Sequence, residues 1–196
     1  MRDEWNNAVS ALGGSVVSTD LETRYAEPHR KYHNATHIHA VLRDATLLVP
    51  SLDPVLVLAI CAHDVIYNAH PGDDERESAA WARTWLTSSA VAEPHIAAVE
   101  SHILATITHT SENPATQVLL DADLAILAAE PDAYDVYIRC VRAEYASYAE
   151  PEWRAGRAKV LSSLLTRDPL YQTPRAQTLW TTQARTNLNR ELTTLT

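Results

Sequence analysis

The stretch "DPVLVLAICAHDVIYN", Asp53 to Asn68, sets a long apolar run directly beside a charged pair. An Asp-Pro step is typical of a helix start, because Asp caps free backbone amides and Pro fits the first helical position. From Val55 to Ala62 such a helix is apolar on every face, which predicts that it is buried. His63 and Asp64 follow without a break. A buried carboxylate is costly unless it is paired or bound to a metal ion, so the pair indicates either a hydrogen-bonded structural site or metal ligands.

Five steps in which Pro follows an acidic or hydroxyl residue each precede a run with helical periodicity: Asp53-Pro54, Glu93-Pro94, Glu130-Pro131, Glu150-Pro151 and Thr173-Pro174. The 196 residues include only four glycines, and no stretch has the alternating pattern of a strand. We therefore predict an all-α fold, a single compact helical bundle with one sizeable core, forming one domain over residues 1–196. Helices are expected near residues 3–12, 35–49, 54–68, 74–88, 94–108, 114–129, 131–149, 151–166 and 174–193.

The composition excludes some classes of partner. A formal net charge of −9 argues against binding to DNA or to an anionic membrane, since both need a basic surface. No apolar run reaches the roughly 18 residues of a membrane span, and the N-terminal segment lacks the apolar core of a secretion signal. Cys61 and Cys140 lie in apolar surroundings and are expected to be buried free thiols. These features predict a cytoplasmic protein and leave its oligomeric state open.

A second apolar run also contains carboxylates. The stretch "LLDADLAIL", Leu119 to Leu127, includes Asp121 and Asp123. Residues two apart on a helix point about 200° away from each other. The two side chains therefore cannot both face solvent while the leucines face the core, and at least one is expected to point inward. The chain has only two lysines to neutralise buried carboxylates, which favours a bound cation.

The stretch "RKYHNATHIH", Arg30 to His39, clusters three histidines. His33 and His37 are four residues apart, a spacing that places both on one helical face. On its own this segment favours surface imidazoles at a polar helix start. Nitrogen and oxygen ligands of the kind gathered in the three stretches suit Mn, Zn, Fe, Ni or Co better than a metal that prefers thiolates. Together the stretches predict one ligand set: His37, His63, Asp64 and Asp123.

These residues resemble the H…HD…D signature of the HD superfamily of metal-dependent phosphohydrolases, which is carried on a helical scaffold. The matching segments are "KYHNATHI", "AICAHDVIYN" and "LLDADLAIL". A wider likeness, to a small bacterial family of predicted HD phosphohydrolases, extends from about Arg24 onward and includes "DDERESA", "VRAEYA" and "ARTNLNREL". The resemblance implies hydrolysis of a phosphate ester or anhydride, most naturally a nucleotide or a related small phosphorylated metabolite. It also implies a divalent transition metal, and it allows a second, loosely held ion such as Mg.

The segment "YHNATHI" is similar to the YHNxxH motif of class I cyclic nucleotide phosphodiesterases as well. Carried over residue by residue, that motif makes His37 the metal ligand and His33 the general acid, whereas a plainer HD pattern would make His33 the ligand. Asp123 matches the closing aspartate of the HD family, with Asp121 as the alternative. The implied mechanism is attack by a metal-activated water, with Asp64 as a bridge to any second metal and His33 protonating the leaving group.

Further candidates have plain structural alternatives. Glu75 or Glu77 would steer the water or a second metal, but an acidic residue also suits the start of a helix. His109 ends a predicted helix and either lines the site or faces solvent. Candidate contacts for a substrate phosphate are Arg30, Lys31, Arg154 and Arg157, although most charged residues are simply solvated. The chain departs from the family pattern at Asp74, where Asn is usual, and the phosphodiesterase segment after HD is not clearly present, so cyclic-nucleotide specificity is not implied.

Two other functions stay open on the same residues. The HD scaffold also serves di-iron oxygenases, which would need further histidine ligands after the HD pair. His70, two helical turns beyond His63, is the weak candidate for such a ligand. A non-catalytic binding module with a structural metal is the third possibility, and the intact ligand set argues against it.

Overall fold

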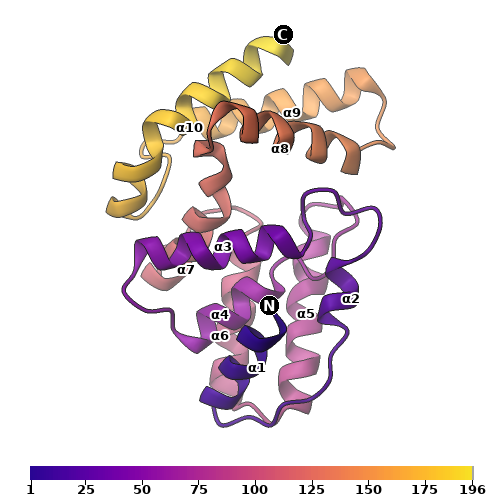
Figure 1. Cartoon of the computed structure of the whole chain (residues 1–196), viewed down its shortest axis with the longest axis vertical. Helices are drawn as coiled ribbons and strands as arrows, with labels where there is room; N and C mark the ends of the chain where they lie inside the picture. Colours follow the sequence, from indigo (N-terminus) through magenta and orange to yellow (C-terminus); the bar gives the residue numbers. More distant parts are fainter. Residues whose placement is uncertain (196) are drawn as a thin grey trace.

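The computed structural model describes residues 1–195, and within them the chain is all-α, with no β-strand. The predicted fold class is therefore confirmed. Ten α-helices and one 3-10 helix, η1, follow one another in the described residues (Figure 1): α1 (Arg2–Ala11), α2 (Leu21–Tyr25), α3 (Ala35–Leu48), α4 (Pro54–Ala62), α5 (Asp73–Ser88), α6 (Glu93–Ala105), α7 (Pro114–Asp123), η1 (Leu124–Ala128), α8 (Pro131–Glu144), α9 (Glu150–Leu165) and α10 (Pro174–Leu195).

The apolar side chains gather in two clusters instead of the one core that was expected. The first cluster is built mainly from α1 to α7, and the second from η1 and α8 to α10. Figure 1 shows α8, α9 and α10 lying together beyond α3 and α7, with the η1 segment leading up to them. Leu48 of α3 borders both clusters. The tight turn of η1 directs the chain away from the first cluster, so the apolar faces of the last three helices pack on one another.

α4 is the central helix of the first cluster, as its apolar sequence predicts. It packs against α1, α3, α5, α6 and α7. Asp53 accepts a hydrogen bond from the Val55 amide at 2.8 Å and so caps the first turn. The helix ends at Ala62 and does not continue to Asn68 as expected. His63 and Asp64 therefore lie at the C-terminal end of a buried helix, which carries them into the interior.

Other predicted helix bounds differ as well: the helix expected over 131–149 ends at Glu144, and the helix expected over 94–108 ends at Ala105. The helix expected over 114–129 changes from α to 3-10 after Asp123, which is the last residue of α7. The short helix α2 lies between the helices expected over 3–12 and 35–49, where no helix was predicted. Five residues are too few to reveal a helical period in the sequence.

Cys61 and Cys140 are both free, but only Cys61 is buried, while Cys140 is half-buried on α8. Over residues 1–195, none of the helices combines the length and apolar character needed to cross a membrane.

Candidate metal centre

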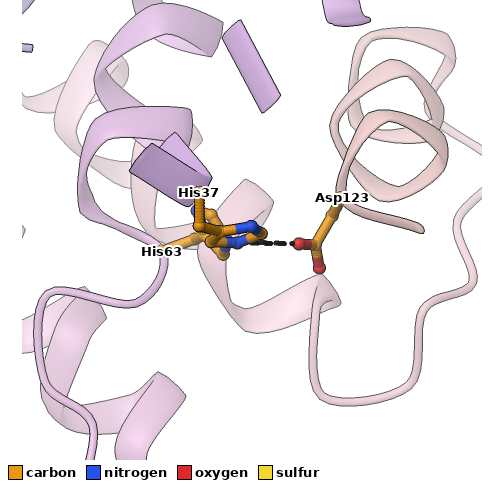
Figure 2. A group of neighbouring side chains, drawn as sticks. All are labelled: His37, His63 and Asp123. Carbon is orange, nitrogen blue, oxygen red and sulfur yellow. Dashed lines mark hydrogen bonds and ion pairs between the residues drawn. The ribbon is translucent and has the colours of Figure 1, made fainter. Parts of the chain in front are cut away.

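Three helices bring the predicted ligands to one place (Figure 2). His37 lies on α3, His63 directly follows α4, and Asp123 ends α7. One potential ligand atom from each residue lies within 4.8 Å of the other two. The Nε2 atom of His37 is 3.3 Å from His63 Nε2 and 3.1 Å from Asp123 Oδ1. His63 Nε2 is 3.5 Å from the same carboxylate oxygen. These three residues therefore form a compact group of potential ligands.

Asp64 adjoins this group through the two imidazoles. Its Oδ2 atom lies 3.3 Å from His37 Nε2 and 3.1 Å from His63 Nε2. Metal–ligand bonds of about 2.1 Å set neighbouring ligand atoms about 3.0–3.4 Å apart in octahedral or tetrahedral geometry, which matches the contacts around the imidazoles. Two carboxylates and two neutral imidazoles also balance the charge of a divalent cation. The donor set therefore fits such an ion in both spacing and charge.

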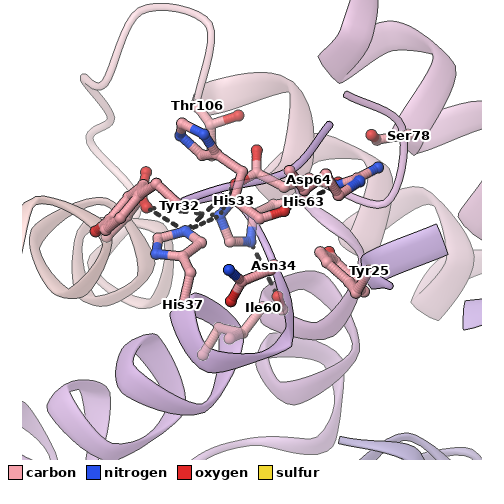
Figure 3. Close-up of polar contacts among 12 residues, drawn as sticks. Tyr25, Tyr32, His33, Asn34, His37, Ile60, His63, Asp64, Ser78 and Thr106 are labelled. Atoms are coloured by element: carbon pink, nitrogen blue, oxygen red, sulfur yellow. Dashed lines mark hydrogen bonds and ion pairs between the residues drawn. The ribbon is translucent and has the colours of Figure 1, made fainter. Parts of the chain in front are cut away.

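One hydrogen bond orients His63 for this role (Figure 3). The Nδ1 atom of His63 donates to the carbonyl of Ile60 at 2.9 Å. A carbonyl can only accept, so in the neutral imidazole Nδ1 carries the proton and Nε2 keeps its lone pair. This is the tautomer that a metal ligand bound through Nε2 requires. The same bond satisfies one of the last carbonyls of α4, which lack partners within the helix.

The four side chains of the cluster have shifted pKa values. Burial lowers the pKa of His63, but Asp64 and Asp123 outweigh this effect and raise the pKa well above its usual value. The pKa of His37 is raised in the same way: burial lowers it, but hydrogen bonds to both carboxylates outweigh burial. Burial raises the pKa of both carboxyl groups, but neighbouring histidines outweigh this effect. His63 holds the pKa of Asp64 well below its usual value. Hydrogen bonds from His109 and His37 do the same for the pKa of Asp123. Positive charge at this point stabilises both carboxylates, as a metal cation would.

Arg30 supports the backbone behind the cluster. Its guanidinium donates to the carbonyls of Asp64 at 2.6 Å, Val65 at 2.8 Å and His33 at 3.0 Å, and to the Glu27 carboxylate at 3.0 Å. The exposed fraction of its side chain is 0%. Arg30 therefore supports the backbone of the HD pair from a fully buried position, and its candidate contact with a substrate phosphate stays a prediction.

His33 lies beside the cluster but outside α3. Asn34 is the N-cap of that helix, so His33 and His37 do not share a helical face as their spacing suggested. Their rings are nevertheless 5.5 Å apart between centroids, and the His33 ring stacks on Tyr67 at 4.2 Å. His33 Nδ1 donates to Glu144 Oε2 at 2.7 Å. Its Nε2 atom is thus the nitrogen left for another partner.

Glu144, the last residue of α8, is a site residue that the sequence did not reveal. Its Oε1 atom accepts hydrogen bonds from the amides of Lys31 at 2.7 Å, Tyr32 at 2.7 Å and His33 at 2.9 Å. Its side chain is only 1% exposed. Burial raises the pKa of Glu144, but the bonds to His33 and to the amides outweigh it and lower the pKa. The carboxylate therefore stays ionised and fixes the loop before α3.

The two aspartates of α7 have different partners. Asp121 accepts hydrogen bonds from the amides of Gln172 at 2.8 Å and Thr173 at 2.6 Å, just before α10. It is 1% exposed, and burial raises its pKa. Asp123 alone reaches the imidazoles. The geometry thus favours Asp123 as the ligand, whereas Asp121 fixes the backbone just before α10, and both side chains point inward.

His109 holds the second oxygen of Asp123. Its Nε2 atom donates to Asp123 Oδ2 at 3.0 Å. The backbone of His109 has a φ of 50°, in the left-handed region that non-glycine residues rarely adopt. Its carbonyl accepts bonds from Arg167 at 3.1 Å and from Gln172 at 3.4 Å, which hold this conformation. His109 therefore orients the carboxylate and also lines the neighbouring cavity.

The cluster borders a cavity of about 490 Å³ between α8, α9 and the loop after α4. Glu75 lines it, but one of its oxygens also accepts the Gly72 amide at 2.5 Å and so caps α5. Arg157 lines it as well and is paired through two nitrogens with Glu191, at 2.7 and 3.0 Å. His70 is exposed and does not line this cavity. With Glu75 and Arg157, six of the predicted site residues line this cavity; the other four are His33, Asp64, His109 and Asp123.

A second cavity, of about 620 Å³, borders the cluster along α3. His37 and Asp123 line it, as does Trp180 of α10. Tyr32 and Tyr137, whose rings meet edge-on at 4.7 Å, line both cavities and stand between them. Comparisons of the chain with protein-family models, with curated proteins and with solved structures find no match.

Proposed function

We propose that this protein is a metal-dependent phosphohydrolase of the HD type, acting on a small phosphorylated, nucleotide-like compound. One observation carries the proposal. Nitrogen and oxygen donors from the ends or faces of three helices converge with contacts of 3.1 to 3.5 Å, at the wall of a cavity. The proposed ligands of a divalent ion such as Mn, Zn, Fe, Ni or Co are His37, His63, Asp64 and Asp123.

The bound ion would polarise a phosphoryl oxygen and make a water molecule more acidic. The protein's own contribution is to hold its ligands in one orientation before the substrate arrives. His63 is fixed by the Ile60 carbonyl, Asp123 by His109, and the backbone of Asp64 by Arg30. Such outer contacts orient metal ligands and raise their affinity for the ion.

His33 is the proposed proton donor to the leaving group. Its Nδ1–H is held by ionised Glu144, so Nε2 is the atom available to a substrate. The residue lines the same cavity as Asp64 and Asp123, at the wall formed with Tyr67. A proton delivered by a side chain in this way contributes about 10²- to 10⁴-fold to a rate. No covalent nucleophile is needed for phosphoryl transfer to water.

The test is metal analysis together with phosphate release from a panel of nucleotides and sugar phosphates. The α7 helix offers a matched pair of variants, Asp123→Asn and Asp121→Asn, because both aspartates are screened from solvent and only one reaches the imidazoles. Asp123→Asn should lose the ion and the activity. Asp121→Asn should keep both while unfolding more easily. A wild-type protein without bound transition metal, or an Asp123→Asn variant that hydrolyses as fast as wild type, would refute the proposal.

A further inference from the structure

The cavity beside the cluster has a wall rich in aromatic rings. The ring centroids of Tyr145 and Tyr148 are 5.6 Å apart, and those of Tyr145 and Trp153 are 5.4 Å apart, so these three rings are continuous. A volume of about 490 Å³ is typical of a pocket for a small organic molecule. Flat rings stack favourably on such a wall. The aromatic residues that line the cavity are Tyr32, Tyr67, Tyr137, Tyr145, Tyr148 and Trp153.

The charges of the cavity are unfavourable for a chain of phosphates. Among the described residues that line it, Arg157 is the one arginine or lysine, and Glu191 already neutralises it. Beyond the proposed ligands, the wall carries the acidic residues Asp74, Glu75 and Glu152. A second and third phosphoryl group would therefore meet carboxylates with no free arginine or lysine to offset the repulsion.

The Tyr67 hydroxyl adds a polar group to this aromatic wall. The hydroxyls of Tyr67 and Tyr145 lie close enough that each shifts the pKa of the other. Within residues 1–195, however, the Tyr67 hydroxyl makes no hydrogen bond of ordinary geometry. A buried hydroxyl without a partner is uncommon in folded proteins and indicates a partner supplied by water or by a ligand. The wall therefore has one hydrogen-bonding position to offer to the edge of a bound ring.

We propose that this cavity selects substrates with a single phosphoryl group on a leaving group that carries a flat ring, and that it discriminates against nucleoside triphosphates. The inference rests on the proposed function, because it places the phosphoryl group at the metal cluster. The ring then lies against Tyr145, Tyr148 and Trp153.

The first test measures binding by calorimetry with two non-hydrolysable probes, phenylphosphonate and methylphosphonate, on the manganese-loaded protein. Burial of the ring should make phenylphosphonate bind about 10- to 100-fold tighter than methylphosphonate. Tyr148→Leu should weaken phenylphosphonate about 2- to 10-fold. Trp180→Leu, which alters the second cavity, is the matched control and should leave the affinity unchanged. Equal affinity for the two probes, or a loss in Trp180→Leu alone, would overturn the inference.

The second test compares kcat/KM for adenosine monophosphate and adenosine triphosphate. The monophosphate should be favoured by about tenfold or more, because the carboxylates repel the additional charge. Glu152→Gln should narrow this ratio, and Glu150→Gln, its exposed neighbour outside the cavity, should not. A higher kcat/KM for the triphosphate overturns the inference. If neither nucleotide is cleaved, the calorimetric comparison of phenylphosphonate with methylphosphonate decides whether the inference holds. Release of phosphate only from esters without a ring overturns this inference and leaves the proposed function standing, whereas no release from any ester refutes the proposed function.

Discussion

Glu144 joins α8 to the loop that carries His33, and its replacement gives two separable effects. In Glu144→Ala, the amides of Lys31, Tyr32 and His33 lose their common acceptor. The Lys31 amide is exposed and can bond to water, but the other two are partly buried. A buried donor without a partner costs about 1–3 kcal/mol. We therefore expect the free energy of unfolding to fall by about 2–4 kcal/mol, measured by urea denaturation.

Glu144→Gln isolates the imidazole from the rest of the loop. The amide oxygen of Gln can still accept the three backbone N–H groups, but its NH₂ group then faces His33 Nδ1 as a donor. His33 must move its proton to Nε2 to accept this bond. Loss of the charge-assisted bond costs about 1–2 kcal/mol. Nitrogen NMR of the imidazole reports the tautomer directly. If His33 keeps its proton on Nδ1 in Glu144→Gln, and Glu144→Ala is as stable as wild type, the assigned contacts are wrong.

Four further outcomes are expected. Asp121→Ala leaves two amides before α10 unpaired and should lower the free energy of unfolding by about 2–4 kcal/mol, with metal content unchanged. Burial lowers the pKa of His102, so as the pH falls this imidazole is protonated in the unfolded chain before it is protonated in the folded protein. The free energy of unfolding should therefore be at its full value above about pH 6.5 and decrease below it. His102→Gln should reduce this pH dependence, measured by denaturation at several pH values. Tyr67→Phe should cost no stability, whereas Tyr171→Phe, which loses a bond to a carbonyl, should cost about 1 kcal/mol. Manganese at about 100 times its dissociation constant should raise the free energy of unfolding by about 2.7 kcal/mol, and His63→Ala should abolish this increase in thermal melts.

Much of the fold was accessible from local sequence patterns. The apolar run of α4 predicted a central buried helix because it has no polar face to turn toward solvent. The same reasoning identified His63 and Asp123 as anomalies, since imidazole and carboxylate groups in apolar runs need partners. In the structure, His63 and Asp123 lie beside each other and are each other's partners.

The remaining contacts depend on residues far apart in the chain. Glu144 is 111 positions from His33, so no local period could connect them. The apolar run alone does not distinguish Asp121 from Asp123, because the amides of Gln172 and Thr173 that occupy Asp121 lie 51 and 52 positions further along the chain. The charge of Arg30 made it a candidate for a phosphate contact. The sequence could not show that the carbonyls of Asp64 and Val65 accept hydrogen bonds from its guanidinium.

The central claim is that His37 is a metal ligand and that His33 donates a proton to the leaving group. Its most direct test is the metal content of His37→Ala and His33→Ala, measured by plasma mass spectrometry on proteins whose helical content matches wild type. The arrangement of donor atoms predicts that His37→Ala loses the ion, and that His33→Ala keeps it while phosphate release slows. Loss of the ion from His33→Ala with full retention in His37→Ala would contradict the account.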